Sequence, residues 1–241
     1  MTQQIAADNL KRHLADNSYP GRGLIIGRDP DGGWVQAYWI MGRSDNSRNR
    51  IFVCEGDTVR TEAADPSKVE DPSLIIYNAL RQTGSTYVVT NGAQTDGIHD
   101  GMAAGRSFAD CLLEWAHEPD APNNTPRISG CLDLSGSAAE VWLSIIVASD
   151  FGPEASEHRF FRYAAIEPGL GYGITTYQGD GSPLPPFEGS PLLFPLAGNA
   201  EAVADTLWGA LDRDNRISLA VRAIDGAGGS TFVLRNKHKG D

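Results

Sequence analysis

The chain is divided into many short apolar segments by turn-forming residues, and this pattern restricts its fold more than any other feature. Its 241 residues include 27 Gly and 14 Pro, so turns are frequent and strands should be short. Ten segments are rich in β-branched and aromatic residues and bounded by Gly, Pro, Asp or Asn, which predicts strands. They are residues 23–28, 34–43, 50–55, 86–90, 127–134, 140–149, 159–166, 171–177, 217–224 and 231–235.

Three internal segments predict helices. Asp71-Pro72 has the composition of a helix start, and Gly84 stands where such a helix would end. Ser107 opens a second helix, whose apolar side chains fall on one face. The third covers residues 201–212. A weaker pattern at residues 5–14 is compatible with a loosely attached helical arm.

Ten strands against three or four helices is too strand-rich for a doubly wound parallel sheet. The order of the elements favours an α+β fold with stacked sheets and helices outside. Residues 154–158 and the Pro-rich run 181–195 have the composition of surface loops. We therefore expect an arm, residues 1–18, followed by a single domain, residues 19–241.

The charge balance excludes one class of partner. The chain has 20 basic and 31 acidic residues, a net charge of −11, whereas a duplex nucleic-acid binder needs basic surface. Three widely spaced cysteines give no disulfide framework, which favours a reducing compartment. No apolar run approaches the length that spans a bilayer, and the N-terminus is polar. We expect a cytoplasmic protein with neither nucleic acid nor membrane as partner.

The most unusual local feature is the polar run 42–50, which contains three arginines and two serines after a strongly apolar strand. Guanidinium groups, hydroxyls and backbone donors in one loop suit a phosphate monoester. A solvated loop that pairs with surface acids is the alternative. If the first two strands form a hairpin across the turn at residues 29–33, Arg22 and Arg43 become neighbours and a possible two-arginine clamp.

Three further groups of polar residues are candidates for ligand contacts. Thr90 to Asp96 follows a strand with amide, hydroxyl and carboxylate groups, which suit the edge of a heterocycle, although Asn-Gly is also an ordinary turn. Residues 123–128 form a proline-stiffened loop, and Tyr77-Asn78 is expected in mid-helix. The chain lacks a Walker loop, a G-x-S-x-G elbow and histidines at metal-ligand spacing, so chemistry without metal or cofactor fits best.

Together these segments resemble the archaeal-type inosine monophosphate (IMP) cyclohydrolases and their bacterial relatives, over residues 19–225. Each motif is weak alone, but five in the same order make the resemblance fairly specific. The matching stretches are residues 19–28, 37–48, 76–81, 89–96 and 124–128.

The resemblance implies a four-layer αββα sandwich of two mostly antiparallel sheets, similar to N-terminal-nucleophile hydrolases but without autoprocessing. It implies closure of the pyrimidine ring of a formamidoimidazole-carboxamide ribotide, a purine ribotide precursor, to give IMP and water, with no metal or coenzyme. Because both reacting groups belong to one molecule, the protein's task is to fix their rotamer and stabilise charge on the formyl oxygen.

Residue roles follow from the same resemblance. Arg22, Tyr77 and Asp96 are the catalytic candidates, with Arg22 and Tyr77 facing the formyl and carboxamide groups. Phosphate is expected at Arg43, Ser44 and Arg48, and the base or ribose at Asn91, Asp96 and Arg127. The substrate-binding candidates in full are Arg28, Arg43, Ser44, Asn46, Arg48, Asn78, Asn91, Gly92, Thr125 and Arg127.

One departure leaves the general acid or base open. An acidic residue is expected shortly before Asn124-Thr125-Pro126-Arg127, but Glu118 and Asp120 stand further back. Two other functions remain: a relative that acts on a different ribotide or amide, and a non-catalytic purine nucleotide-binding protein. The oligomeric state is also open, a homo-oligomer included.

Overall fold

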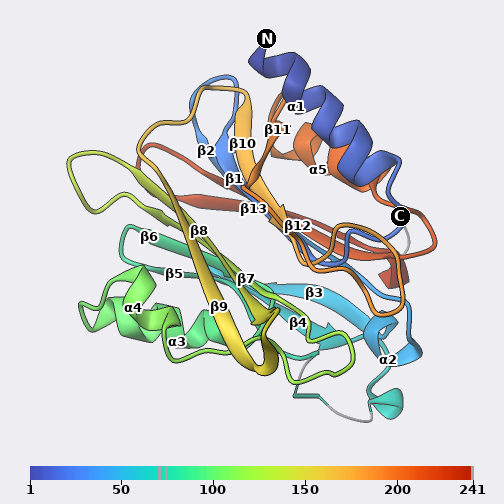
Figure 1. Ribbon diagram of the computed structural model, residues 1–241. Helices are drawn as coiled ribbons and strands as arrows, with labels where there is room; N and C mark the ends of the chain where they lie inside the picture. The colour runs from blue at the N-terminus through green and yellow to red at the C-terminus, as the bar shows by residue number, and fades with distance from the viewer. Residues whose placement is uncertain (70–71, 74, 240–241) are drawn as a thin grey trace.

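The computed structural model describes residues 1–69, 72–73 and 75–239. In this part of the chain, thirteen strands form two antiparallel sheets that face each other (Figure 1). Helices lie on the outer side of each sheet, so the layers run helix, sheet, sheet, helix. The predicted α+β class with stacked sheets and outer helices is confirmed.

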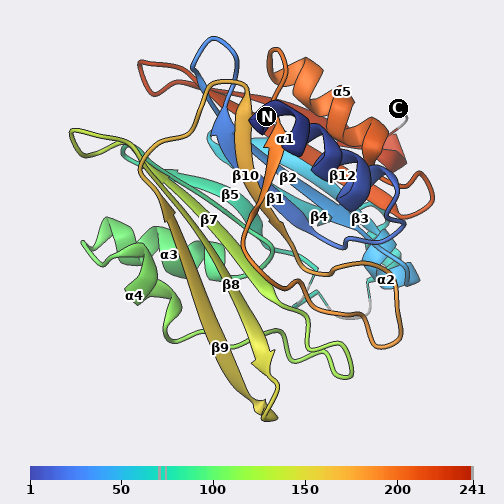
Figure 2. The same cartoon turned by 45° about the horizontal axis from the view of Figure 1, so that its top comes forward.

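The first sheet has six strands and is covered by two helices, one at the N-terminus and one late in the chain. α1 (Thr2–Leu10), continued by a π-helical turn, and α5 (Ala200–Ala210) cover its outer face (Figure 2). In spatial order the strands are β11 (Leu192–Pro195), β10 (Leu170–Thr175), β1 (Gly23–Arg28), β2 (Trp34–Met41), β12 (Arg216–Ile224) and β13 (Ser230–Asn236).

The second sheet has seven strands in sequence order. α3 (Gln94–Ala103) and α4 (Phe108–Leu112) cover its outer face (Figure 1). The strands are β3 (Arg50–Glu55), β4 (Thr58–Ala63), β5 (Asn78–Thr83), β6 (Thr86–Thr90), β7 (Arg127–Asp133), β8 (Glu140–Ser149) and β9 (Gly152–Tyr163).

Strand β2 shows why the central strands are almost continuously apolar. Its side chains alternate between two cores: Ala37 and Trp39 pack toward α1 and α5, whereas Tyr38 and Ile40 pack between the sheets. A strand covered on both faces needs apolar side chains at every position. The layered arrangement therefore follows from the composition of the central strands.

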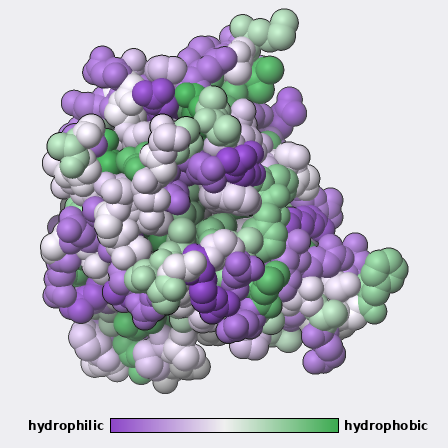
Figure 3. Space-filling model, turned by 90° about the vertical axis from the view of Figure 1, so that its left-hand side faces the viewer, coloured by the Kyte–Doolittle hydropathy of each residue, from purple (hydrophilic) through white to green (hydrophobic). Residues whose placement is uncertain are grey.

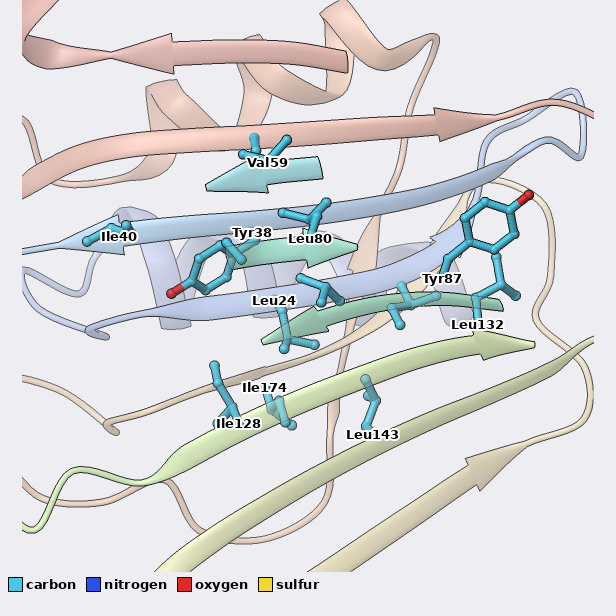
Figure 4. Close-up of a cluster of buried hydrophobic side chains, with 14 of the residues drawn as sticks. Leu24, Tyr38, Ile40, Val59, Leu80, Tyr87, Ile128, Leu132, Leu143 and Ile174 are labelled. Atoms are coloured by element: carbon cyan, nitrogen blue, oxygen red, sulfur yellow. The ribbon is translucent and has the colours of Figure 1, made fainter. Parts of the chain in front are cut away.

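The largest core lies between the two sheets (Figure 4). Leu24 and Tyr38 from the first sheet meet Ile128 and Leu143 from the second, and all four are fully buried. This core ends on one side at the loops that enter β1, β3 and β7. Those loops carry the polar residues described below.

One predicted helix is wrong. Where a helix was expected from Asp71-Pro72 to Gly84, the chain forms β5, which pairs with β4 and β6; Asp71 itself lies outside the described residues. Gly84, at a φ of +54°, closes the hairpin between β5 and β6 and does not cap a helix. Tyr77 and Asn78 therefore lie at a strand start and not in mid-helix.

Two predicted loops also need correction. Residues 154–158 belong to β9, and the run 181–195 ends in β11. The N-terminal helix is not loosely attached, because Leu14 is fully buried against the first sheet and Asn9 donates to the Leu193 carbonyl. The helices predicted at Ser107 and at residues 201–212 are confirmed.

The side of the molecule at the left in Figure 1 is a mixture of hydrophilic, intermediate and hydrophobic surface (Figure 3). Within the described residues, every helix is too short or too polar to cross a membrane.

Glycine is required where β1 and β10 approach closely, and Gly27→Ala tests this. A methyl group at Gly27 would lie 2.3 Å from both the Gly171 Cα and the Leu170 carbonyl oxygen, which are backbone atoms. We expect the free energy of unfolding in urea to fall by at least about 2 kcal/mol. The matched control is Gly209→Ala in α5, where nothing lies within 4 Å. That variant should be stabilised by about 0.5–1 kcal/mol. Equal stability of the two variants would contradict this account.

Candidate active site

A cavity of about 240 Å³ lies at the end of the sheets near α2 (Asp45–Arg48), at the right in Figure 1. Five segments meet there: the chain entering β1, the connection from β2 to β3, the chain before β5, the loop between α4 and β7, and the chain after β10. Its charged lining residues are Arg22, Arg43, Arg50, Glu118 and Asp120. Three guanidinium groups and two carboxylates therefore share one cavity.

The hairpin between β1 and β2 is present as predicted. Gly23 lies opposite Trp39, so the residues just outside the paired strands, Arg22 and Arg43, project at the same end of the sheet. Both line the cavity. The register of one hairpin thus brings together two arginines that lie 21 positions apart in the sequence.

Arg22 and Glu118 form a buried ion pair at the cavity wall. The Arg22 Nη1 and Nη2 atoms donate to Oε1 and Oε2 of Glu118 at 3.0 and 2.8 Å, and Nη1 also donates to the Asn91 carbonyl at 3.1 Å. Only 3% of the Glu118 side chain is exposed. Burial by itself lowers the pKa of Arg22, but the Glu118 carboxylate outweighs it and the pKa lies well above its ordinary value. Arg22 is therefore a fixed cation.

Arg127 supports this pair from the side away from the cavity. Its guanidinium lies 3.9 Å from Glu118, stacks 5.1 Å from the centre of the Trp115 ring, and donates to Gln94 at 3.0 Å. A side chain at Gly92 would overlap Arg127, since a Cβ would lie 2.8 Å from Nη1. Gly92 is thus needed to admit the arginine.

Arg50 is the second buried cation, and the described residues offer it no carboxylate partner. Its Nε donates to the Ser47 carbonyl at 2.8 Å, and the side chain faces the cavity. Burial lowers the pKa of Arg50, and the positive charge of Arg22 lowers it further, opposed by Tyr77. A buried, uncompensated guanidinium that lines a cavity is a site for an anion.

Two tyrosines lie beside these cations. The hydroxyl oxygens of Tyr38 and Tyr77 are 2.6 Å apart, and both side chains are almost completely buried. Burial, reinforced by Tyr77, raises the pKa of Tyr38 well above its ordinary value despite the nearby arginines. Tyr38 therefore stays protonated and can donate a hydrogen bond at any physiological pH.

Arg43 lies at the more exposed side of the cavity. Its guanidinium stacks 4.9 Å from the centre of the Tyr19 ring and forms an ion pair with Asp180. Ser44 caps α2: its hydroxyl accepts a hydrogen bond from the Ser47 backbone, and the Ser47 hydroxyl accepts one from the Ser44 backbone. This capping box holds both serines at the cavity wall.

The wall across from α2 carries hydrogen-bonding groups. Asp120 accepts from the backbone N–H of Thr125 at 2.6 Å and from its hydroxyl. The Thr125 hydroxyl also lies 2.5 Å from that of Tyr177, whose pKa burial raises to about 12. In the described residues, Asp120 has no basic partner.

Several predicted site residues lie elsewhere. Asp96, in α3, accepts hydrogen bonds from Asn78 and Arg81 of β5, and neither Asp96 nor Asn78 lines the cavity. Arg28 stands at the opposite end of β1, where it donates to the Gly32 carbonyl. Arg48 is turned toward the Gly42 carbonyl and Asn215.

Two further candidates lie near the cavity without lining it. Asn46 belongs to α2, and its Oδ1 has no hydrogen-bond partner in the described chain. Asn91 is fully buried, donates to the Pro126 carbonyl at 2.9 Å and accepts from the Ile128 N–H at 2.9 Å. Its side chain therefore fixes the start of β7, close to Thr125 and Arg127.

Sequence reasoning left Arg50, Glu118 and Asp120 out of the candidate set. Arg50 could have been found, because it is two residues from Phe52, which points into the core between the sheets, and alternate residues of a strand share a face. The two acids were noted as lying too far before the Asn-Thr-Pro-Arg motif. The loop folds back, with the Glu118 N–H donating to the Thr125 carbonyl at 2.9 Å, and this places both acids at the cavity.

No group of three or more His, Cys, Asp or Glu side chains in the described part of the chain is arranged to hold a metal ion. The polar groups of the cavity are guanidinium, hydroxyl, amide and carboxylate groups, which suit a small polar anion with further hydrogen-bonding positions.

Neutralising Glu118 should expose its structural role. In Glu118→Gln, Arg22 and Arg127 remain buried without a carboxylate, so we expect the free energy of unfolding to fall by about 3 kcal/mol. The control is Glu114→Gln, which removes an exposed partner of Arg106 and should change stability by less than about 0.5 kcal/mol. Urea unfolding measures both. A Glu118→Gln protein as stable as the control would refute the buried pair.

Comparison with known proteins identifies the family. Residues 19–229 match the model of the IMP cyclohydrolase-like proteins. The chain is 32% identical to the IMP cyclohydrolase of Methanopyrus kandleri over 162 residues, 66% of this chain and 75% of that protein. It is 28% identical to the IMP cyclohydrolase of Methanothrix thermoacetophila over 218 residues, 84% and 98% of the two chains. The corresponding protein of Methanocaldococcus jannaschii is 25% identical over 212 residues, 86% and 94% of the two. The chain is thus a member of the IMP cyclohydrolase-like family.

Proposed function

We propose that the protein is an IMP cyclohydrolase, which closes the pyrimidine ring of a formamidoimidazole-carboxamide ribotide. The carboxamide nitrogen bonds to the formyl carbon and loses one of its two protons. The formamido nitrogen loses its own proton as the C=N bond of the new ring forms, and the formyl oxygen leaves with these two protons as water. Family membership supports this activity. The structural observation that carries it is the gathering of Arg22, Arg43 and Arg50 in one cavity of a protein with a net charge of −11.

The phosphate binds at the α2 side of the cavity in this proposal. Arg43 and Arg50 provide the cationic charge, and the Ser44 hydroxyl provides a donor. Arg50 takes the place that sequence reasoning gave to Arg48, because Arg48 is turned away. A dianion satisfies the guanidinium of Arg50, which has no carboxylate partner in the described residues.

The reacting groups lie near Arg22 and the tyrosine pair. As the nitrogen attacks, negative charge grows on the formyl oxygen, and Arg22 is a fixed cation already oriented by Glu118. The Tyr38 and Tyr77 hydroxyls lie beside Arg22, just behind the residues that line the cavity, and Tyr38, whose pKa burial raises, is the proposed hydrogen-bond donor toward this region. Donors placed before the reaction lower the barrier because they need no rearrangement as charge develops.

Asp120 is the proposed proton acceptor. Glu118 is held by both nitrogens of Arg22, which makes it a poor base, whereas Thr125 is the only partner of the Asp120 carboxylate among the described residues. The carboxamide nitrogen must lose a proton for the ring to close, and a carboxylate at the cavity wall can take it. Asp96, our candidate from the sequence, does not line the cavity and has no role in this proposal.

The wider proposals follow from the same function. The substrate is a small phosphorylated ribotide, the compartment is the cytoplasm, and nucleic acid is not a partner. The arrangement of two facing antiparallel sheets between helices supports kinship with the N-terminal-nucleophile hydrolase sandwich. Of the two other functions, the nucleotide sensor also uses the cavity, and only turnover distinguishes it.

Incubation with the formamido ribotide tests the function. We expect the ultraviolet absorbance change of purine formation with the native protein and at least about a 100-fold loss of kcat/KM in Arg43→Glu, because phosphate would meet a carboxylate. Arg106→Glu reverses a charge between α3 and α4, away from the cavity, and should keep full activity. Tight IMP binding without turnover would identify a sensor, and absence of both would indicate a different substrate.

Asp120→Asn separates proton transfer from binding. The amide keeps the size of the carboxylate but cannot accept the proton, so we expect kcat to fall by about 100-fold or more while the affinity for IMP, measured by calorimetry, changes little. Unchanged kcat would assign the proton to another group.

A further inference from the structure

The Arg43 guanidinium has a carboxylate partner in this structure. Asp180, in the segment that follows β10, forms an ion pair with its Nη1 atom, and the Gly181 carbonyl accepts from the same atom at 3.0 Å. Both charged side chains are partly open to solvent, with 38% of Arg43 and 52% of Asp180 exposed. A phosphate group that uses Arg43 therefore competes with a carboxylate of the protein itself.

The three cavity arginines differ in how firmly they are compensated. Arg22 is held by Glu118, which is buried and binds through both oxygens. Arg50 has no carboxylate partner in the part of the chain described. Of the two described carboxylates that pair with these arginines, Glu118 is buried and Asp180 is exposed. A ligand can therefore displace Asp180 without leaving a buried charge unpaired, because the displaced Asp180 carboxylate turns into water.

The backbone around Asp180 is anchored, so this exchange needs only a side-chain movement. The Gln178 N–H donates to the Pro185 carbonyl at 3.0 Å. The Leu184 N–H donates to the Asn123 side chain at 3.2 Å, and both Leu184 and Asn123 line the cavity. Asp180 is held between these points at the edge of the site.

We propose that Asp180 is an internal competitor for Arg43, which it occupies until a phosphate monoester dianion replaces it. This inference rests on the proposed function for the identity of the ligand. A monoester dianion carries more charge and more acceptor oxygens than a carboxylate, so it wins the exchange. A dephosphorylated nucleoside offers nothing to exchange, and Arg43 then stays paired with Asp180. The ion pair thus weakens by a small factor the binding of ligands whose phosphate uses Arg43, and it leaves ligands without a phosphate unaffected.

The test is Asp180→Asn, which removes the charge and keeps the shape. Calorimetry at constant ionic strength measures the Kd of inorganic phosphate, and a parallel assay measures the KM of the formamido ribotide. Because an exposed ion pair contributes little, we expect both constants to fall by about two- to fivefold. Affinity for inosine, which lacks the phosphate, should not change.

The matched control is Asp205→Asn in α5, which removes one negative charge from an exposed ion pair with Arg235 of β13. It should leave phosphate affinity and KM as in the native protein, which separates exchange at Arg43 from the change in net charge. Unchanged or weaker phosphate binding in Asp180→Asn would overturn the inference and make Asp180 a residue that orients Arg43. Tighter phosphate binding without any cyclisation by the native protein would refute the proposed function and leave the inference standing.

Discussion

The cavity depends on one buried carboxylate. Glu118 holds Arg22 through both oxygens and lies 3.9 Å from Arg127, so it compensates two guanidiniums at once. Without it, two buried cations would face each other with no opposite charge, a costly arrangement in a medium of low dielectric constant. The same contact ties the loop before β7 to the entry of β1. The positions of Asp120 and Thr125, on that loop, follow from it.

The compensation is selective, and this explains how an acidic protein can bind an anion. Glu118 neutralises Arg22 and Asp180 neutralises Arg43 at the solvent side, whereas Arg50 has no carboxylate partner in the described part of the chain and donates to the Ser47 carbonyl. The net charge of −11 is spread over the surface, where salt screens it beyond roughly 10 Å. Inside the cavity the nearest charges decide, and there the Arg50 guanidinium has no carboxylate partner among the described residues. Net charge is therefore no guide to whether a cavity can bind a small phosphate ester.

How far the fold could be predicted depended on the burial of each element. The strand at residues 34–41 was visible because both of its faces are buried and almost every position is apolar. Residues 78–83 are as compatible with a helix as with a strand, and hydrogen bonds to β4 and β6 decide the outcome. Helix α3 was hidden by Gly97 and Gly101, which are poor helix formers. These glycines are present because a Cβ at Gly101 would lie 2.5 Å from the Cys111 sulfur and one at Gly97 3.1 Å from the Trp115 ring.

Only the part of the site that depends on pairing between neighbouring strands could be predicted from the sequence. A two-strand register placed Arg22 near Arg43, because the turn between β1 and β2 fixes which residues lie opposite. Glu118 pairs with Arg22 although the two residues are 96 positions apart in the sequence, and no local sequence pattern predicts that contact. Asp96 illustrates the reverse error: it follows a strand that ends near the cavity, but it is the third residue of α3 and faces Asn78 and Arg81. A polar residue after a strand reaches the site only if it precedes the turn that leads the chain to the outer face of the sheet. Asp96 follows that turn because α3, which the sequence analysis did not predict, begins at Gln94.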